Sequence, residues 1–442
     1  MEERHVEITR TGSLALAHYR LSSFREGNLP GVEQVMRTQF ELLHDKNIPT
    51  VYLVGDTDIP EPEHGSEGIV VYSAIRMDEK NLGSQSEQAD NKPSAEEIAR
   101  GINLRIPDSG IIFHNTIQAA RYNEHYGIAA ARIVDQGVLG ERPLCVSWVH
   151  DPVGSPHHIY PMLPTQNVAR IAVISQTREK ALYQLFDQMI QLGYIIPPNL
   201  DIRVIPNTFN SMYFDQQTAI PQTFTEFAPH FTSFTQREHL AQKATDVERL
   251  LTDNETLKLL LVGRPIHNKG VIEAMKMADA LTTLIRQKVA LVVTNAPDTD
   301  TLVNREYWLQ VKSLRGKIHN DKLQIVFLGG VKSDYMKWLY ERAQLLVAPF
   351  ENEGFGLPPA EAALVGTPSV ISDDPALQET TSGHAKTVER AIWQREPLTA
   401  AREVFAYLGS NEAQRDIKKI QHHIKTHYSP ETITDSLLKI IE

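Results

Sequence analysis

The sequence contains a single cysteine, Cys145, among its 442 residues. One thiol cannot form a disulfide within the chain, so a disulfide-stapled secreted scaffold is excluded and a reducing compartment is favoured. Cys145 lies in an apolar run, which predicts a buried packing thiol rather than a nucleophile. The first ten residues, MEERHVEITR, are polar and charged, unlike a secretory signal. These features predict a cytoplasmic protein.

The sequence also lacks long hydrophobic runs and an excess of basic residues. No apolar stretch approaches the ~20 residues that cross a bilayer, so no transmembrane segment is expected. The formal net charge is -11, from 44 Lys and Arg against 55 Asp and Glu. Because a nucleic-acid-binding surface is basic, this balance argues against a nucleic acid as partner. It still allows a local basic pocket for a phosphate, and it leaves the oligomeric state and peripheral membrane contact undecided.

The length and the patterning of the chain predict two α/β domains. A chain of 442 residues exceeds the usual size of one core. Short apolar runs alternate with helical patterns in both halves, which is typical of parallel, doubly wound sheets. The strands expected in the first half are 14–19, 51–54, 69–72, 111–113, 144–149, 171–174 and 202–205. Those expected in the second half are 257–262, 290–293, 323–328, 345–348 and 369–371.

Helical periodicity supplies the connections between these strands. The expected helices are 31–46, 116–133, 177–192, 270–286, 300–318, 332–343, 358–365, 411–427 and 430–441. The stretch 77–93 is polar and irregular, which indicates a surface loop. The predicted boundaries are therefore 1–208 for a first domain, 209–254 for a connecting segment, 255–410 for a second domain and 411–442 for C-terminal helices.

The most informative stretch is 344–372, QLLVAPFENEGFGLPPAEAALVGTPSVIS. An apolar strand is followed by a loop with Gly354 and Gly356, and Pro358 and Pro359 then open a helix, where a missing N–H costs little. In open α/β sheets, ligands bind at the carboxyl ends of strands. A helix start also suits a phosphate. The stretch therefore predicts a ligand-binding turn.

Two carboxylates bracket this turn. Glu353 precedes it, and Glu361 is expected in the first helical turn, with seven residues between them. Taken alone, each glutamate could be a solvated charge or a complement to the helix dipole. A dinucleotide-binding fingerprint is a weaker alternative, because the third glycine is absent and two prolines intrude. The joint pattern favours a site at which a polyol contacts both carboxylates.

The segment EGFGLPPAE, from Glu353 to Glu361, resembles the E-x7-E signature of retaining glycosyltransferases of the GT-B fold, the glycosyl transferase group 1 family (family 4). The resemblance implies two Rossmann-like domains facing a cleft, with the final helices crossing back to the first domain. It implies transfer of a hexose from a UDP- or GDP-type sugar nucleotide to a hydroxyl acceptor, with retention at the anomeric carbon. No cofactor is required by this resemblance, and a need for a divalent cation stays open.

The segment 263–270, GRPIHNKG, follows a strand and opens a helix. Its Arg264 and Lys269 can stabilise the negative charge that grows on a departing diphosphate. By the resemblance, these two positions match the Arg and Lys that hold the donor diphosphate. The segment is not a P-loop, because no Gly-Lys-Ser/Thr occurs at the required spacing. Two solvated surface cations are the alternative.

Further donor contacts are assigned by the resemblance alone. Glu361 would bind ribose hydroxyls, and Glu353 would orient hydroxyls of the transferred sugar. The turn itself, formed by Gly354, Phe355, Gly356 and Leu357, would line the donor phosphate. Gly329 and Val331 belong to a segment that would pack on the nucleobase through its backbone, for which a simple turn is the alternative.

The first domain offers His150, which follows the strand at 144–149. By the resemblance, His150 would contact the transferred sugar, with Asp151 beside it. A histidine satisfied by backbone groups is the alternative. Gly31, at a helix start, and Asn207, in Pro-Asn-Thr, complete a candidate donor and acceptor loop set. A turn glycine without a ligand is an equally good interpretation of Gly31.

Other polar residues carry weaker indications. His114 ends another strand and is expected to line the same cleft, and Ser175 matches a position where the family often has serine. His157 and His158 resemble a metal-binding pair, but no Asp-x-Asp or His-Glu-x-x-His accompanies them. A pair of loop residues is therefore expected there.

Two alternative functions stay open at this point. One is another GT-B activity, such as a sugar-nucleotide epimerase. The other is a non-catalytic sensor that binds a sugar nucleotide without turning it over. The sequence names neither the base and sugar of the donor nor the acceptor, which could be a small polyol or acid, a saccharide or a glycolipid.

Overall fold

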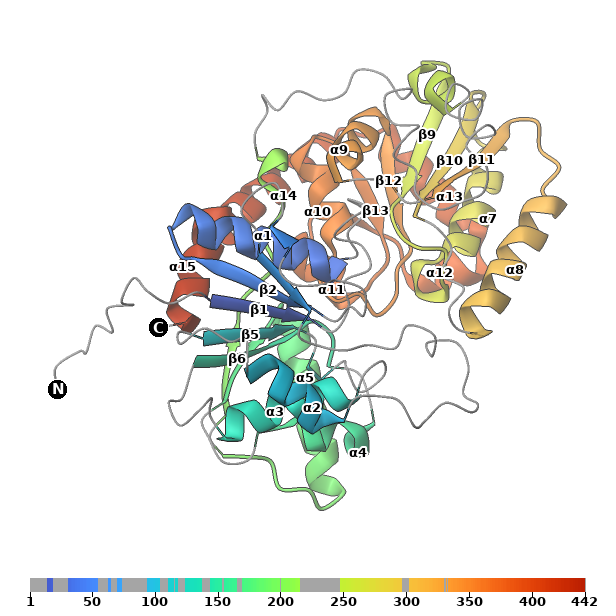
Figure 1. Cartoon of the computed structure of the whole chain (residues 1–442). Coiled ribbons are helices and arrows are strands. Elements are labelled where there is room, and N and C mark those ends of the chain that lie inside the picture. Colours follow the sequence, from blue (N-terminus) through green and yellow to red (C-terminus); the bar gives the residue numbers. More distant parts are fainter. Residues whose placement is uncertain are drawn as a thin grey trace. The chain divides into compact units, whose positions relative to one another are not determined.

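A computed structural model describes residues 14–18, 31–54, 63–64, 70–73, 94–103, 110–114, 116–117, 124–136, 144–152, 155–164, 169–198, 200–214, 247–295, 302–329, 331 and 333–441 (Figure 1). These residues form two compact units. Unit 1 contains the described residues up to Thr208 together with the last helix, α15 (Pro430–Ile441), and unit 2 contains those of Phe209–Ser429. The surface loop expected at 77–93 lies outside the described residues, as does most of the expected connecting segment.

Unit 1 is built on an eight-stranded sheet with the order β3-β4-β2-β1-β5-β6-β7-β8. Its neighbouring strands are parallel, except that β3 pairs antiparallel with β4. The strands are β1 (Leu14–His18), β2 (Thr50–Val54), β3 (Glu63–His64), β4 (Val70–Ser73), β5 (Gly110–His114), β6 (Leu144–Val149), β7 (Ala169–Val173) and β8 (Leu200–Val204).

Helices cover this sheet because successive strand residues face opposite sides and both sides are apolar. The helices are α1 (Gly31–Asp45), α2 (Ala95–Asn103), α3 (Glu124–Gln136), α4 (Pro156–Ile159) and α5 (Gln176–Gln191). Apolar residues of α2 and α3 pack with Ala15 and Ala17 of β1 in one core cluster. The intervening Leu16 is also buried, and α15 contacts α1 and β6.

Unit 2 contains a second parallel sheet, with the order β11-β10-β9-β12-β13-β14. Its strands are β9 (Thr256–Leu261), β10 (Lys288–Thr294), β11 (Leu323–Gly329), β12 (Leu345–Ala348), β13 (Ser369–Ile371) and β14 (Lys386–Thr387). The helices are α7 (Val271–Leu281), α8 (Leu302–Lys317), α9 (Ser333–Arg342), α10 (Leu357–Leu364), α11 (Pro375–Thr380), α12 (Arg390–Arg395), α13 (Pro397–Leu408) and α14 (Glu412–His427).

The predicted fold class, two doubly wound α/β sheets, is confirmed. The bounds of β6, β12, β13 and α15 agree with the sequence prediction. The helix predicted for 116–133 is wrong at its start, because Thr116 and Ile117 form a buried turn and α3 begins at Glu124. The helices α2, α11, α12 and α13 were not predicted.

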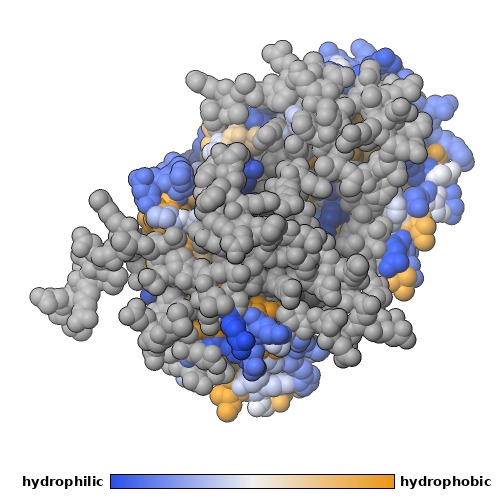
Figure 2. All heavy atoms as spheres, viewed as in Figure 1, coloured by the Kyte–Doolittle hydropathy of each residue, from blue (hydrophilic) through white to orange (hydrophobic). Residues whose placement is uncertain are grey.

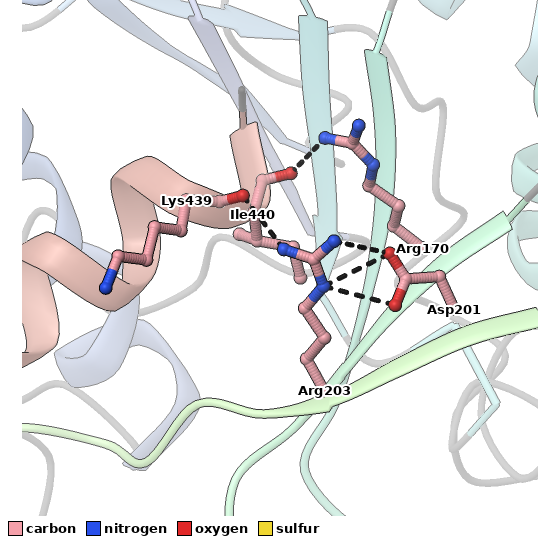
Figure 3. Close-up of polar contacts among 5 residues, drawn as sticks. All are labelled: Arg170, Asp201, Arg203, Lys439 and Ile440. Atoms are coloured by element: carbon pink, nitrogen blue, oxygen red, sulfur yellow. Dashed lines mark hydrogen bonds and ion pairs between the residues drawn. The ribbon is translucent and has the colours of Figure 1, made fainter. Parts of the chain in front are cut away.

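Two arginines of the unit 1 sheet hold the carboxyl end of α15 (Figure 3). Arg170 on β7 donates from Nη1 to the Ile440 carbonyl at 2.6 Å, and Arg203 on β8 donates from Nη1 to the Lys439 carbonyl at 2.9 Å. Asp201 accepts from Nη2 of Arg203 at 2.7 Å, which fixes that guanidinium. The last carbonyls of a helix lack intrahelical partners and favour cations. These contacts explain why α15 belongs to unit 1 although it follows unit 2 in the chain.

The surface of the described residues is largely hydrophilic, with separate hydrophobic spots (Figure 2). The large exposed hydrophobic residues are Tyr183, Ile190, Leu192 and Ile195 of unit 1 and Leu302, Val303, Leu309, Leu398 and Phe405 of unit 2. Within the described ranges, none of the helices combines the length and the apolar character that a membrane span requires.

We expect Arg170→Ala to loosen α15. The substitution removes a charge-assisted hydrogen bond from a helix-end carbonyl, which costs about 1–2 kcal/mol. Hydrogen exchange followed by mass spectrometry should show faster exchange across 430–441. Arg132→Ala is the matched control, because its ion pair with Glu96 is exposed and should change stability by less than about 0.5 kcal/mol. Unchanged exchange in α15 of the Arg170 variant would show that the apolar face alone holds the helix.

Candidate functional site

The strand order of unit 2 reverses between β9 and β12. From β9 the chain adds β10 and β11 on one side, and it then returns to place β12 on the other side. The carboxyl ends of these parallel strands lie at one edge, and ligands of open α/β sheets bind beside such a reversal. The loop after β9 contains the predicted cations, and the loop after β12 contains the predicted glycine turn. The topology therefore brings the two predicted segments together.

The two loops touch through their backbones. The N–H of Glu351 donates to the carbonyl of Asn268 at 2.8 Å. Gly270, which precedes α7, has a φ of 59°. A Cβ on Gly270 would lie 2.5 Å from the carbonyl oxygen of Pro349, so a side chain does not fit. The close approach of the two loops thus depends on a glycine in the left-handed region.

Lys269 and Glu353 form an ion pair at this junction. The Nζ of Lys269 contacts Oε1 of Glu353, and the two side chains are only 18% and 11% exposed. The same ammonium lies 4.5 Å from the ring centroid of the buried Phe350, a cation–π distance. Arg264, at the start of the same loop, is exposed. The structure therefore brings one predicted cation directly against a predicted sugar-orienting carboxylate.

Asp374 holds the backbone of Glu353, and the sequence did not identify this residue. Its Oδ2 accepts from the N–H of Glu353 at 3.1 Å, and its Oδ1 accepts from the N–H of Ala376 at 2.9 Å. Burial raises the pKa of Asp374, while the hydrogen bonds from Glu353 and Ala376 oppose that rise. An aspartate before Pro375 is a recognisable N-cap signal. The contact with Glu353 is long-range, and no local pattern encodes it.

The glycine turn is fixed by its neighbours. Gly356 has a φ of 91° and precedes α10, and a Cβ there would lie 2.9 Å from Cδ2 of Leu377. The carbonyl of Phe355 accepts from the hydroxyl of Thr380. Pro358 and Pro359 occupy the first turn of α10, as predicted, so these two positions supply no N–H to a ligand.

Glu361 lies in the second turn of α10, so its predicted place in the first turn is wrong. The reason is that the helix begins at Leu357, one residue earlier than expected. Glu361 is 5% exposed, and its Oε2 accepts from the hydroxyl of the fully buried Tyr340 at 2.8 Å. Burial raises the pKa of Tyr340 well above its usual range, and the charge of Glu361 adds to the rise. The tyrosine therefore acts as a donor to Glu361.

Gly329 is the last residue of β11, and Val331 follows this strand at the same edge of the sheet. Gly329 has a φ of 80° and forms a bridge with Asn295, which follows β10. Val331 is buried. One strand, β10, separates β11 from β9, so these residues do not directly adjoin the loop with Lys269, which follows β9.

In unit 1, the strand order reverses between β1 and β5. His114 is the last residue of β5, and His150 directly follows β6. The Nδ1 of His114 and the Nε2 of His150 are 3.2 Å apart, and both residues are buried. The hydroxyl of Tyr126 donates to the carbonyl of His114 at 3.2 Å. The predicted His150 is therefore one member of a buried histidine pair.

Asp151 and Ser175 have structural partners. Oδ1 of Asp151 lies 3.0 Å from Nη1 of the buried Arg178, near the start of α5. The hydroxyl of Ser175 accepts from the N–H of Arg178 at 3.1 Å and caps the same helix. Ser175 thus has a capping role that needs no ligand.

The remaining predicted residues are dispersed. Gly31 is the first residue of α1. Asn207 is buried, and no group among the described residues hydrogen-bonds to its Oδ1. His157 and His158 lie in the short helix α4 and not in a loop, where His157 contacts the Tyr194 hydroxyl. In the parts of the chain that the structure describes, no group of three or more His, Cys, Asp or Glu residues is arranged to hold a metal.

The part of unit 2 that contains the candidate site matches a known family. Residues 242–393 match the glycosyl transferases group 1. The O-antigen chain mannosyltransferase RfbU of Salmonella typhimurium is 38% identical over 76 residues, which cover 16% of this chain and 22% of the relative. An uncharacterized glycosyltransferase of Methanocaldococcus jannaschii is 33% identical over 128 residues, covering 29% and 30%. The chain thus spans less than a third of the length of these relatives.

Structure comparison extends over nearly the whole chain. An alpha,alpha-trehalose-phosphate synthase (UDP-forming) from Burkholderia xenovorans, solved in complex with glucose-6-phosphate, has a TM-score of 0.68 at 12% identity. The match covers 98% of this chain and 100% of that structure. At this identity the likeness establishes the fold. Residues 242–393 thus match the glycosyl transferases group 1 family, and the fold of the chain is GT-B.

Proposed function

We propose that this protein is a retaining glycosyltransferase that moves a hexose from a nucleoside-diphosphate sugar to a hydroxyl acceptor. The ion pair of Lys269 and Glu353, at the strand-order reversal of unit 2, carries this proposal. A sugar nucleotide presents an anionic diphosphate beside neutral sugar hydroxyls. Here a partly exposed cation can bind the diphosphate, and the partly exposed carboxylate in contact with it can accept hydrogen bonds from the sugar hydroxyls. The names of the similar proteins, a mannosyltransferase and a UDP-forming synthase, support a hexose and a nucleoside diphosphate.

The diphosphate is assigned to Lys269 and Arg264. In this structure Glu353 is the partner of Lys269, and phosphate oxygens would add acceptors to the same ammonium. Arg264, exposed at the start of the same loop, provides a second cation for the leaving group. Both charges would stabilise the diphosphate as the bond to the sugar breaks.

The hydroxyl groups of the donor are assigned to the two glutamates. Glu353 would accept hydrogen bonds from the transferred sugar, with Asp374 fixing its backbone. Glu361 would accept from the ribose, with Tyr340 fixing its carboxylate. Each glutamate is thus held by a buried partner, and this preorganisation favours tight and directed binding.

The proposed transfer proceeds on one face of the sugar. The bond between the anomeric carbon and the diphosphate breaks, and the acceptor oxygen bonds to that carbon from the same side. The proton of the acceptor moves to the departing phosphate oxygen, so no separate protein base is needed. His150, Asp151, Gly31 and Asn207 of unit 1, together with Gly329, Val331 and the glycine turn of unit 2, are the further candidates for donor or acceptor contacts.

Removing either cation should slow transfer strongly. We expect Lys269→Ala and Arg264→Ala to lower kcat/KM about 100-fold or more, the effect of losing one charge-stabilising group. The assay follows release of nucleoside diphosphate from whichever UDP-, GDP- or ADP-sugar binds in a calorimetric screen. Lys276→Ala and Arg286→Ala are exposed controls in unit 2 and should keep wild-type rates. Near-wild-type turnover by the Lys269 variant would overturn its assignment.

Changing Glu361 should act mainly on nucleotide binding. We expect Glu361→Gln to weaken the Kd for free nucleoside diphosphate about 10-fold, because a charge-assisted hydrogen bond becomes a neutral one. Tyr340→Phe should weaken it less, since the carboxylate stays in place but loses a donor. Calorimetry measures both, with the exposed Glu306→Gln as control. If Glu361→Gln and the wild type bind nucleoside diphosphate with equal affinity, Glu361 does not bind the ribose.

Product stereochemistry separates a retaining transferase from the alternatives. With an α-linked donor, proton NMR of the isolated product should show an α linkage. A β-linked product would establish inversion, and a changed sugar on unspent donor would establish an epimerase. Binding of a sugar nucleotide without turnover, across a panel of polyol, saccharide and lipid acceptors, would favour a sensor.

A further inference from the structure

Within the described residues, the chain passes from unit 1 to unit 2 after Thr208 and returns after Ser429. Phe209 and Tyr428, one beside each of these two crossings, both contact Phe355 of the glycine turn. The ring centroids are 6.0 Å apart for Phe209 and Phe355, 5.4 Å for Phe355 and Tyr428, and 6.3 Å for Phe209 and Tyr428. The three residues are 1%, 4% and 6% exposed. They therefore form a closed, buried aromatic triad within unit 2.

A second set of contacts connects the first crossing with Glu361. Residues 209–213, here called the crossing segment, begin the described part of unit 2. Its Tyr213 packs edge-on against Tyr340, with ring centroids 6.2 Å apart, and Tyr340 donates to Glu361. The carbonyl of Met212 accepts from Nζ of the buried Lys337 at 3.0 Å. Both parts of the E-x7-E signature, the turn and the distal glutamate, are thus connected to the crossing segment.

The glycine turn cannot move unless these aromatic residues move with it, because other contacts hold its remaining sides. The hydroxyl of Thr380 binds the carbonyl of Phe355, and Leu377 fills the space beside Gly356. Packed side chains transmit displacement because protein interiors hold few voids. A shift of Phe355 toward or away from a bound phosphate therefore requires a response from Phe209 and Tyr428. Residues at the ends of chain elements are also the usual places where domain motions are absorbed.

We propose that the crossing segment and Tyr428 are positioning residues of the glycine turn, and that they couple occupancy of this turn by a nucleoside diphosphate to the backbone at both crossings. This inference rests on the proposed function, because it takes the turn as the diphosphate site. The coupling is carried by contiguous contacts: the aromatic triad for Phe355 and the Tyr213–Tyr340 pair for Glu361. Binding of a nucleoside diphosphate then stiffens the two places where one unit continues into the other.

The test is hydrogen exchange of the full chain, with UDP, GDP and ADP added separately. In the wild type, the nucleotide that binds should slow exchange at 264–271 and 352–361, where the ligand is placed, and also at 205–214 and 425–431. In Phe209→Leu and Tyr428→Leu, protection at the two crossings should disappear, and the Kd should rise about 10-fold. Tyr428→Phe keeps the ring and should behave as wild type. Tyr407→Leu removes an equally buried tyrosine that donates to Asp416 in the same unit, and it should keep the coupling.

Each outcome decides between the two proposals. Protection of the two loops in the wild type without protection of either crossing would overturn the coupling and leave the proposed function intact. No binding of any of the three nucleotides, or binding without protection of the loops, would overturn both. Wild-type exchange decides this even where a leucine variant fails to fold. For folded variants, additive effects of Phe355→Leu and Tyr428→Leu on the Kd would also contradict the coupling, because residues in contact are expected to be non-additive.

Discussion

The close approach of two loops at the strand-order reversal of unit 2 is the constraint on which the candidate site depends. The carbonyl of Pro349 lies so close to Gly270 that a Cβ on this residue would collide with it. A backbone hydrogen bond from Glu351 to Asn268 also joins the two loops. Lys269 directly precedes Gly270, so the backbone contact decides how near its ammonium comes to Glu353. The ion pair therefore follows from topology and glycine chemistry and not from the freedom of two long side chains.

Local patterns in the sequence identified most of the framework. Apolar runs bounded by turn residues predicted the buried strands β6, β12 and β13 at their observed ends, because a parallel strand covered on both faces is apolar at nearly every position. Short elements such as α11 and β14 contain too few residues for a hydrophobic period to be recognised. The helix α10 begins one residue earlier than predicted, and this difference moves Glu361 from the end of the first turn to the start of the second.

The candidate site was predictable where its residues share a motif and not where they meet through folding. The segments with Lys269 and Glu353 were identified, but their pairing spans 84 positions in the sequence and depends on how two strands are ordered in a sheet. Asp374 and Tyr340 were missed because their patterns are those of a helix cap and a core aromatic residue. Only the folded chain turns them into supports for two glutamates.

Because α15 returns to unit 1, the two units differ in how many segments of the chain supply their described residues. The described part of unit 2 lies within one span of the chain, 209–429, whereas the described part of unit 1 comes from two pieces that flank it. Arg170 and Arg203, on strands of the first piece, donate hydrogen bonds to carbonyls of α15, which is the second piece. A gene fragment encoding 209–429 can therefore contain the whole described part of unit 2, but a fragment for the described part of unit 1 needs an artificial bridge between Thr208 and Pro430. In this sense unit 2 resembles a guest domain inserted into a host.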